Sequence, residues 1–169
     1  MSLHPLVIQL HFARSEFVRC LNGVSETDAV KRLMPMNCIS WYIGHLADQE
    51  QRYWIQIAQH KEMISGLTEL VGHGKPASTP PLVDMWSAWQ AITLAADDFL
   101  STLQTKDLNE FLRLDGKLVH ESIGTMLQRN LYHYWFHTGQ VHSVRELLGH
   151  GDLPEFVGDM STAVYRPES

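Results

Sequence analysis

The sequence lacks two features that would mark a membrane or nucleic-acid protein. It has no apolar run approaching the roughly 20 residues that a transmembrane helix needs. Cations are also few, since 13 Lys and Arg residues stand against 19 Asp and Glu residues, a net charge of −6. Because affinity for DNA or RNA comes mainly from clustered cations, we expect neither a nucleic-acid partner nor a membrane partner.

Cysteine is scarce as well. The only two, Cys20 and Cys38, are too few for a secreted disulfide scaffold and match no zinc-knuckle spacing. We therefore expect both to be reduced and buried. The first residues contain no basic stretch followed by an apolar signal core, which predicts a soluble, cytoplasmic protein.

Apolar residues are plentiful and histidine is unusually frequent. Of the 169 residues, 44% are hydrophobic and 19% are charged, which predicts one globular domain spanning residues 1–169. Ten of the residues are histidines. Their positions relative to the predicted helices decide whether any of them can form a site.

Apolar residues recur with a helical period in four stretches. These stretches are residues 3–21, 37–59, 82–103 and 121–148. They predict an all-α fold, a four-helix bundle with long inter-helix loops. The length of the second and third connections permits a topology other than simple up-and-down.

The connections carry turn-forming residues. Residues 66–81 are rich in Gly and Pro and are expected to be loop. Residues 111–119 alternate around Asp115-Gly116, which indicates a small hairpin or a loop. The tail, residues 152–169, is expected to be irregular chain packed over the bundle.

The last predicted helix carries His133 and His137, four residues apart. Side chains at that spacing lie on one helix face about 5–6 Å apart. Two imidazoles so placed can reach one cation at about 2.0–2.1 Å. The helical period puts His137 in the apolar seam and His133 at its edge. Taken alone, such a pair is more often an ordinary core or surface pair that bonds to water or side chains.

A third histidine, His45, lies midway along the second predicted helix, within its apolar stripe. It can approach the pair from across the core, since helical bundles build metal sites from side chains on facing helices. A zinc-metalloprotease helix is excluded, because the position that would hold its general-base Glu is Tyr134.

Three segments of the sequence resemble motifs of a known family. Residues 41–48 (WYIGHLAD), 133–140 (HYWFHTGQ) and 147–158 (LLGHGDLPEFVG) are similar to motifs of the DinB/YfiT-like metal-dependent four-helix-bundle family. The resemblance implies that His45, His133 and His137 bind a divalent metal ion, zinc or nickel in this family. Many relatives have a basic residue where this chain has Thr138.

Three neutral histidines would leave the metal an open coordination position, as catalytic sites do. That position can activate water or bind a thiolate. The resemblance implies thiol chemistry in some members, so we predict a metal-dependent enzyme, either a thiol S-transferase or a small-molecule hydrolase. Its substrate would be a small molecule, such as a low-molecular-weight thiol. The alternatives are a non-catalytic metal-binding stress-response or structural bundle, and a helical interaction protein with incidental histidines.

No catalytic residue can be assigned from these patterns, but helpers can be named. Asp48 could orient a ligand imidazole or act as a base, or be a solvated carboxylate. Gln140 could bond to a bound ligand, cap the site, or pack against another helix. Tyr53 and Tyr134 could line a pocket or belong to the core. The Trp-rich helices also offer apolar surface, which favours a homodimer.

Overall fold

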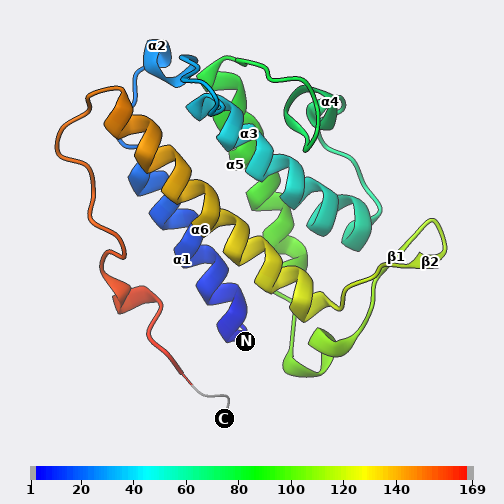
Figure 1. Cartoon of the computed structure of the whole chain (residues 1–169). Coiled ribbons are helices and arrows are strands. Elements are labelled where there is room, and N and C mark those ends of the chain that lie inside the picture. Colours follow the sequence, from blue (N-terminus) through cyan, green and yellow to red (C-terminus); the bar gives the residue numbers. More distant parts are fainter. Residues whose placement is uncertain (1–2, 167–169) are drawn as a thin grey trace.

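Helices dominate the architecture. The structure is a computed structural model that describes residues 3–166. Four long helical segments form a bundle, which confirms the predicted all-α fold (Figure 1). They are α1 (Pro5–Cys20), α3 (Ile39–Glu50) continued by the π-helix η1 (Gln51–Ile57), α5 (Leu82–Leu100) and α6 (Ile123–Leu147).

Shorter elements occupy the connections. These are α2 (Glu26–Ala29), α4 (Leu67–Val71), the 3-10 helices η2 (Thr105–Asn109) and η3 (Met160–Thr162), and the strands β1 (Arg113–Leu114) and β2 (Lys117–Leu118). The strands pair around Asp115-Gly116, where both residues have positive φ, as the predicted hairpin requires.

The expectation of loop throughout residues 66–81 was wrong at α4. This helix is a single short turn that buries Leu67 and Val71 against the bundle. Three apolar residues within five positions are too few to reveal a helical period among neighbouring glycines and prolines. The helix matters because it packs against α3, beside His45.

The bundle is not a simple up-and-down one. Helices α1 and α6 run in one direction and α3 and α5 in the other (Figure 1). The connection between α3 and α5 returns along the bundle, so these consecutive long helices lie parallel. As a result α1 packs on α6 and α3 on α5, while α3 and α6 meet antiparallel across the core.

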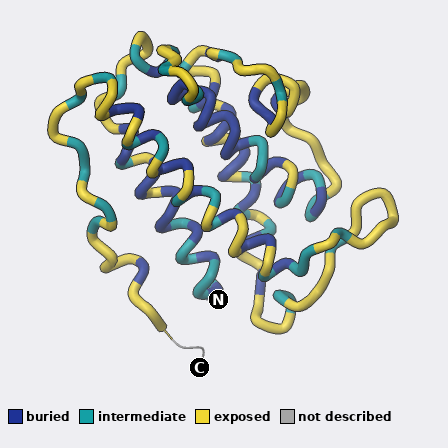
Figure 2. The backbone as a smooth tube through the Cα atoms, in the orientation of Figure 1, coloured by how far each residue is buried: buried dark blue, intermediate teal, exposed yellow. Residues whose placement is uncertain are grey.

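Helix α6 buries one stripe and exposes the opposite one, as Figure 2 shows, whereas α3 has no exposed residue. The Ser122 side chain caps α6 by accepting a hydrogen bond from the Thr125 N–H. Gly149, with φ of 80°, follows its last turn. The buried stripe of α6 includes polar side chains, Asn130 and His137 among them. Buried polar groups need partners, so this stripe marks where chemistry can occur.

Gly44 allows a close approach around His45. A Cβ atom at position 44 would overlap the Met85 sulfur of α5 and lie 3.1 Å from Val71 Cγ1 of α4. The missing side chain therefore lets α3 approach both helices, next to the residue that carries the His45 imidazole.

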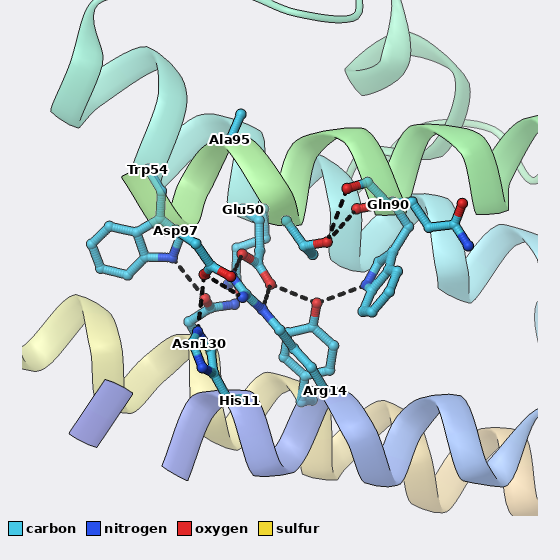
Figure 3. Close-up of polar contacts among 12 residues, drawn as sticks. His11, Arg14, Glu50, Trp54, Gln90, Ala95, Asp97 and Asn130 are labelled. Atoms are coloured by element: carbon cyan, nitrogen blue, oxygen red, sulfur yellow. Dashed lines mark hydrogen bonds and ion pairs between the residues drawn. The ribbon is translucent and has the colours of Figure 1, made fainter. Parts of the chain in front are cut away.

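A buried ion pair joins α1 to α3. Arg14, 5% exposed, donates from Nε to Glu50 Oε1 at 2.8 Å, and its Nη2 pairs with Oε2 of the same fully buried carboxylate (Figure 3). The Tyr134 hydroxyl donates to Glu50 Oε1 at 2.6 Å and accepts from Trp89 Nε1 at 2.8 Å. Glu50 is thus compensated by Arg14 of α1 and Tyr134 of α6, and Trp89 of α5 in turn holds the Tyr134 hydroxyl.

The tail follows the outside of the bundle, as expected. Gln9 Nε2 donates to the Ala163 carbonyl at 2.8 Å, and Ala163 is buried. Residues 167–169, also included in that expectation, lie outside the described part of the chain. Among the described residues, no helix is both long and apolar enough to cross a bilayer.

We expect Glu50→Ala to lower the free energy of unfolding by about 3 kcal/mol, because it removes the fully buried carboxylate that pairs with Arg14 and leaves that buried guanidinium only the partly exposed Asp97, 2.7 Å from Nη1. The matched control is Glu121→Ala, which breaks the surface pair with Arg129 and should cost at most about 1 kcal/mol. Urea denaturation measures both. Equal losses in the two variants would mean that the core pair contributes no more than a surface one.

Candidate metal centre

Three histidines from two helices meet inside the bundle. His45 lies on α3, and His133 and His137 lie one turn apart on α6. Their ring centroids are 4.3 to 5.0 Å apart. His45 and His137 are buried, with 7% and 6% exposure, and His133 is half-buried at the edge of the seam. The structure thus brings together the three residues selected from the sequence.

The nitrogens of these rings are close enough to share one ion. One ligand nitrogen from each ring lies within 4.8 Å of the others. The Nε2 atoms of His133 and His137 are 2.7 Å apart. With metal–nitrogen bonds of about 2.0–2.1 Å, nitrogens this close together could hold one cation.

The opposite nitrogen of each ring has an oxygen partner. His45 Nδ1 lies 2.8 Å from the Val71 carbonyl oxygen at the end of α4. His133 Nδ1 lies 2.8 Å from Gln49 Oε1, and His137 Nδ1 lies 2.7 Å from Gln140 Oε1. The Val71 carbonyl can only accept, so His45 Nδ1 carries its ring proton, and with the Gln49 and Gln140 amide oxygens turned toward the rings, as here, the Nδ1 atoms of His133 and His137 carry theirs.

This arrangement determines what the Nε2 atoms can do. In a neutral imidazole one nitrogen donates and the other accepts, so three protonated Nδ1 atoms leave three Nε2 lone pairs. Lone pairs 2.7 Å apart, as between His133 and His137, repel each other unless a metal ion or a ring proton lies between them. The donor set therefore fits a divalent metal ion, whose histidine ligands commonly donate their other N–H to an oxygen.

Burial keeps these imidazoles neutral. It lowers the pKa of His133 to about 3, with further lowering by His137, His45 and the loop residue His73. Burial likewise lowers the pKa of His137 to about 4, with a contribution from His45. The pKa of His45 is also lowered, again chiefly by burial. Neutral imidazole is the form that binds metals.

Aromatic side chains surround the cluster. Trp41 stacks on His45 at 4.4 Å between centroids, with the planes 16° apart. The ring centroids of Tyr42 and Phe136 lie 5.2 and 5.1 Å from the centroid of the His137 ring. The indole Nε1 of Trp41 is buried and has no hydrogen-bond partner among the described residues. A buried donor without a partner is costly, and this one lies beside the cluster.

The suggested helper residues have different roles from those offered by the sequence. Asp48 accepts a hydrogen bond from Thr68 Oγ1 at 2.5 Å, while His45 Nδ1 donates to the Val71 carbonyl. The backbone of α4, rather than Asp48, thus orients this imidazole. Gln140 does reach the site, where its side chain holds His137.

Neither tyrosine is found to line a pocket at the histidines. Tyr134 is fully buried in the Glu50 network, so the core alternative is confirmed for it. Tyr53 is half-buried. Burial is the main cause that raises its pKa, and the negative charge of Glu121 raises it further. Thr138 is buried, and its carbonyl accepts from the Cys20 thiol of α1. The residue that replaces the relatives' basic side chain thus lies against α1.

Two of the groups that hold the histidine rings were not predicted from the sequence, the Gln49 side chain and the Val71 carbonyl. Gln49 left a signal, since it follows His45 by one helical turn and so shares its face. No sequence pattern indicates Val71, because every residue has a backbone carbonyl. Only the packing of α4 on α3 selects this one.

A surface hollow of about 470 Å³ lies elsewhere, between α6 and the tail. It is lined by Trp135, Thr138, Gly139, His142 and residues 154–156, and by none of the three clustered histidines. With about 100° per residue, these positions fall on the opposite side of α6 from His133 and His137. The hollow is therefore separate from the cluster.

Comparison with known proteins identifies the family. Residues 6–149 match the family described as Mycothiol-S-transferase, which is DinB/YfiT-like. The match covers well over half of the chain, so the chain belongs to this family, and the resemblance stated from three motifs is confirmed. No curated protein matches the chain.

Acid should destabilise the metal-free protein through its histidines. Unfolded, their pKa is about 6.5, whereas the folded His133 and His137 remain neutral down to a pH of about 3 and about 4. As the pH falls below about 6.5 the unfolded chain binds more protons, so stability decreases, by at most about 1.4 kcal/mol per pH unit for each histidine.

The measurement is urea denaturation of metal-free protein between pH 7 and pH 4. His133→Gln/His137→Gln should show a shallower decrease in stability than the parent. The matched control, His60→Gln, removes an exposed histidine and should keep the parent slope. Parallel curves for all three proteins would contradict the assignment of neutral, buried imidazoles.

Proposed function

We propose that this member of the Mycothiol-S-transferase family is a metal-dependent transferase that joins a low-molecular-weight thiol to a small electrophile. In this proposal His45, His133 and His137 are the protein ligands of one divalent ion, zinc or nickel. The thiol is of the mycothiol class, as the family description indicates. The observation that supports the proposal most strongly is the convergence of three neutral imidazoles, each hydrogen-bonded to an oxygen through its Nδ1.

Three protein nitrogens are one fewer than a closed structural zinc site uses. A bound divalent ion would supply a Lewis acid that lowers the pKa of a coordinated thiol, which makes it a thiolate near neutral pH. Overall, a carbon–sulfur bond forms as the electrophile's bond to its leaving group breaks, and the thiol proton is released to solvent. No oxidant or reductant is needed.

The side chains of this protein would position the ligands and exclude water. Val71, Gln49 and Gln140 orient the three rings through Nδ1. Trp41 covers one face of His45, and its buried indole N–H is available to an acceptor atom of a bound small molecule. Phe136 is 62% exposed and touches the His137 ring, so it offers an apolar surface to a substrate at the mouth of the site.

Two other functions use the same ligands. A hydrolase would place activated water, rather than a thiolate, at the open position. A non-catalytic bundle would use the ion to join α3 to α6. The family match and the aromatic shell around the site favour the transferase, since a structural ion needs no substrate surface.

The first test concerns metal binding. Purified protein supplemented with zinc or nickel should retain about one ion per chain, as catalytic sites with three protein ligands do. His137→Ala should lose the ion while circular dichroism remains helical. His142→Ala, which changes a histidine on the opposite face of α6, should retain it. Elemental analysis that finds no metal in the parent, or equal metal in both variants, would contradict the assigned ligands.

The second test concerns turnover. With mycothiol or another small thiol and an alkylating electrophile, the metal-loaded protein should form thioether, detected by mass spectrometry. Removal of the metal and His137→Ala should both abolish the product, and His142→Ala should not. Turnover of ester or amide substrates without thiol would favour the hydrolase. Tight metal binding with no turnover in either assay would favour the non-catalytic bundle.

A further inference from the structure

We infer that Trp54, acting through Asn130 and Gln49, sets the tautomer of His133 and so keeps its Nε2 lone pair available to a metal ion. These three are positioning residues that do not touch the ion. The inference rests on the metal site proposed above. It extends that site inward along the seam between η1 and α6, to side chains that the sequence motifs do not include.

A continuous chain of hydrogen bonds links the four residues. Trp54 Nε1 donates to Asn130 Oδ1 at 2.8 Å, and the two side chains face each other in Figure 3. Asn130 Nδ2 donates to Gln49 Oε1 at 3.0 Å, and the same oxygen lies 2.8 Å from His133 Nδ1. Trp54 and Asn130 are fully buried, so water does not compete for their bonds.

The direction of this chain follows from its first donor. An indole N–H can only donate, so the Asn130 atom that faces it must be the amide oxygen. The Asn130 amide nitrogen then faces Gln49 and must donate, which requires the Gln49 oxygen at that point. Gln49 Oε1 in turn can only accept from His133, so Nδ1 carries the ring proton. At each step only one assignment of donor and acceptor is possible.

The π-helix brings both neighbours of Asn130 in the chain of hydrogen bonds, Trp54 and Gln49, to that residue. Gln49 and Trp54 are five residues apart, and on a regular α-helix they would point about 140° away from each other. The i→i+5 repeat of η1, which begins at Gln51, widens the helix so that both side chains reach one residue of α6. Such local π segments are frequent at functional sites.

The other two histidines are held differently. The Val71 carbonyl that holds His45 is backbone and cannot change from acceptor to donor. Gln140, which holds His137, has no second hydrogen bond among the described residues, so nothing else there fixes which end of its amide faces the ring. His133 is therefore the one side chain of the trio whose tautomer depends on a buried relay.

Trp54→Phe tests the relay by removing the indole N–H and keeping an aromatic ring. The matched control is Trp89→Phe, which removes a buried indole donor of the same kind, bonded to the Tyr134 hydroxyl at 2.8 Å. The first readout is nitrogen NMR of the histidine rings in metal-free protein. We expect the parent and Trp89→Phe to show His133 protonated at Nδ1, and Trp54→Phe to show a mixture of tautomers.

The second readout is zinc affinity by chelator competition. Trp54→Phe should bind zinc about tenfold more weakly, the lower end of the effect of losing an outer-shell partner. Trp89→Phe should bind like the parent. Adding Gln49→Glu should rescue Trp54→Phe, because a carboxylate accepts from His133 Nδ1 in either orientation. Equal tautomers and equal affinities in the two Trp variants would overturn the inference.

A second variant covers the case in which Trp54→Phe does not fold. Asn130→Asp keeps the shape of the side chain but replaces the donor that faces Gln49 with an acceptor. Gln49 should then turn its amide nitrogen toward His133 and favour the Nε2–H tautomer, with weaker zinc binding. An unchanged His133 tautomer in folded Asn130→Asp would overturn the relay.

The readouts also separate this inference from the proposed function. If the parent binds no zinc but its tautomer responds to Trp54→Phe and Asn130→Asp, the relay stands and the metal site fails. If the parent binds zinc and neither variant alters the tautomer, the metal site stands and the relay fails.

Discussion

Three imidazoles can occupy the interior of this bundle only while they are neutral, and the other features of the site follow from that constraint. Burial lowers the pKa of His45, His133 and His137, and an oxygen lies within hydrogen-bond distance of each Nδ1. The remaining nitrogens carry lone pairs that point into a small shared volume. Uncharged ligands of this kind would leave a bound divalent ion with its full charge, which is what an ion that activates a thiol needs.

The neighbouring residues Gln49 and Glu50 divide the polar interior into two parts. Glu50 is the charged one, and Arg14 and Tyr134 bind its oxygens on the side toward α1. Gln49 is uncharged and serves His133. A full negative charge is thus neutralised, one residue after the Gln49 that serves His133, by a guanidinium from another helix. The interior accommodates a charge and a neutral ligand cluster side by side because each has its own partners.

Much of this arrangement could be predicted from local pattern. The four helical periods located the long helices, and the turn at Asp115-Gly116 located the hairpin. The spacing of His133 and His137 and the place of His45 in an apolar stripe selected the cluster, and three motifs indicated the family. Helix α4 was missed because one turn is too short to show a period. Its Val71 carbonyl was missed because backbone oxygens carry no sequence signal.

The sequence by itself determined which residues lie on the same helix face, because side-chain direction repeats with the local helical period. That is enough to place His133 beside His137 and to bury His45. Only the tertiary structure decided which nitrogen of each ring points inward, since this depends on acceptors from α4, from the α3 side chain Gln49 and from the next turn of α6. It also decided that Trp54 reaches Asn130, because a widened helix, rather than a regular one, faces α6 at that level.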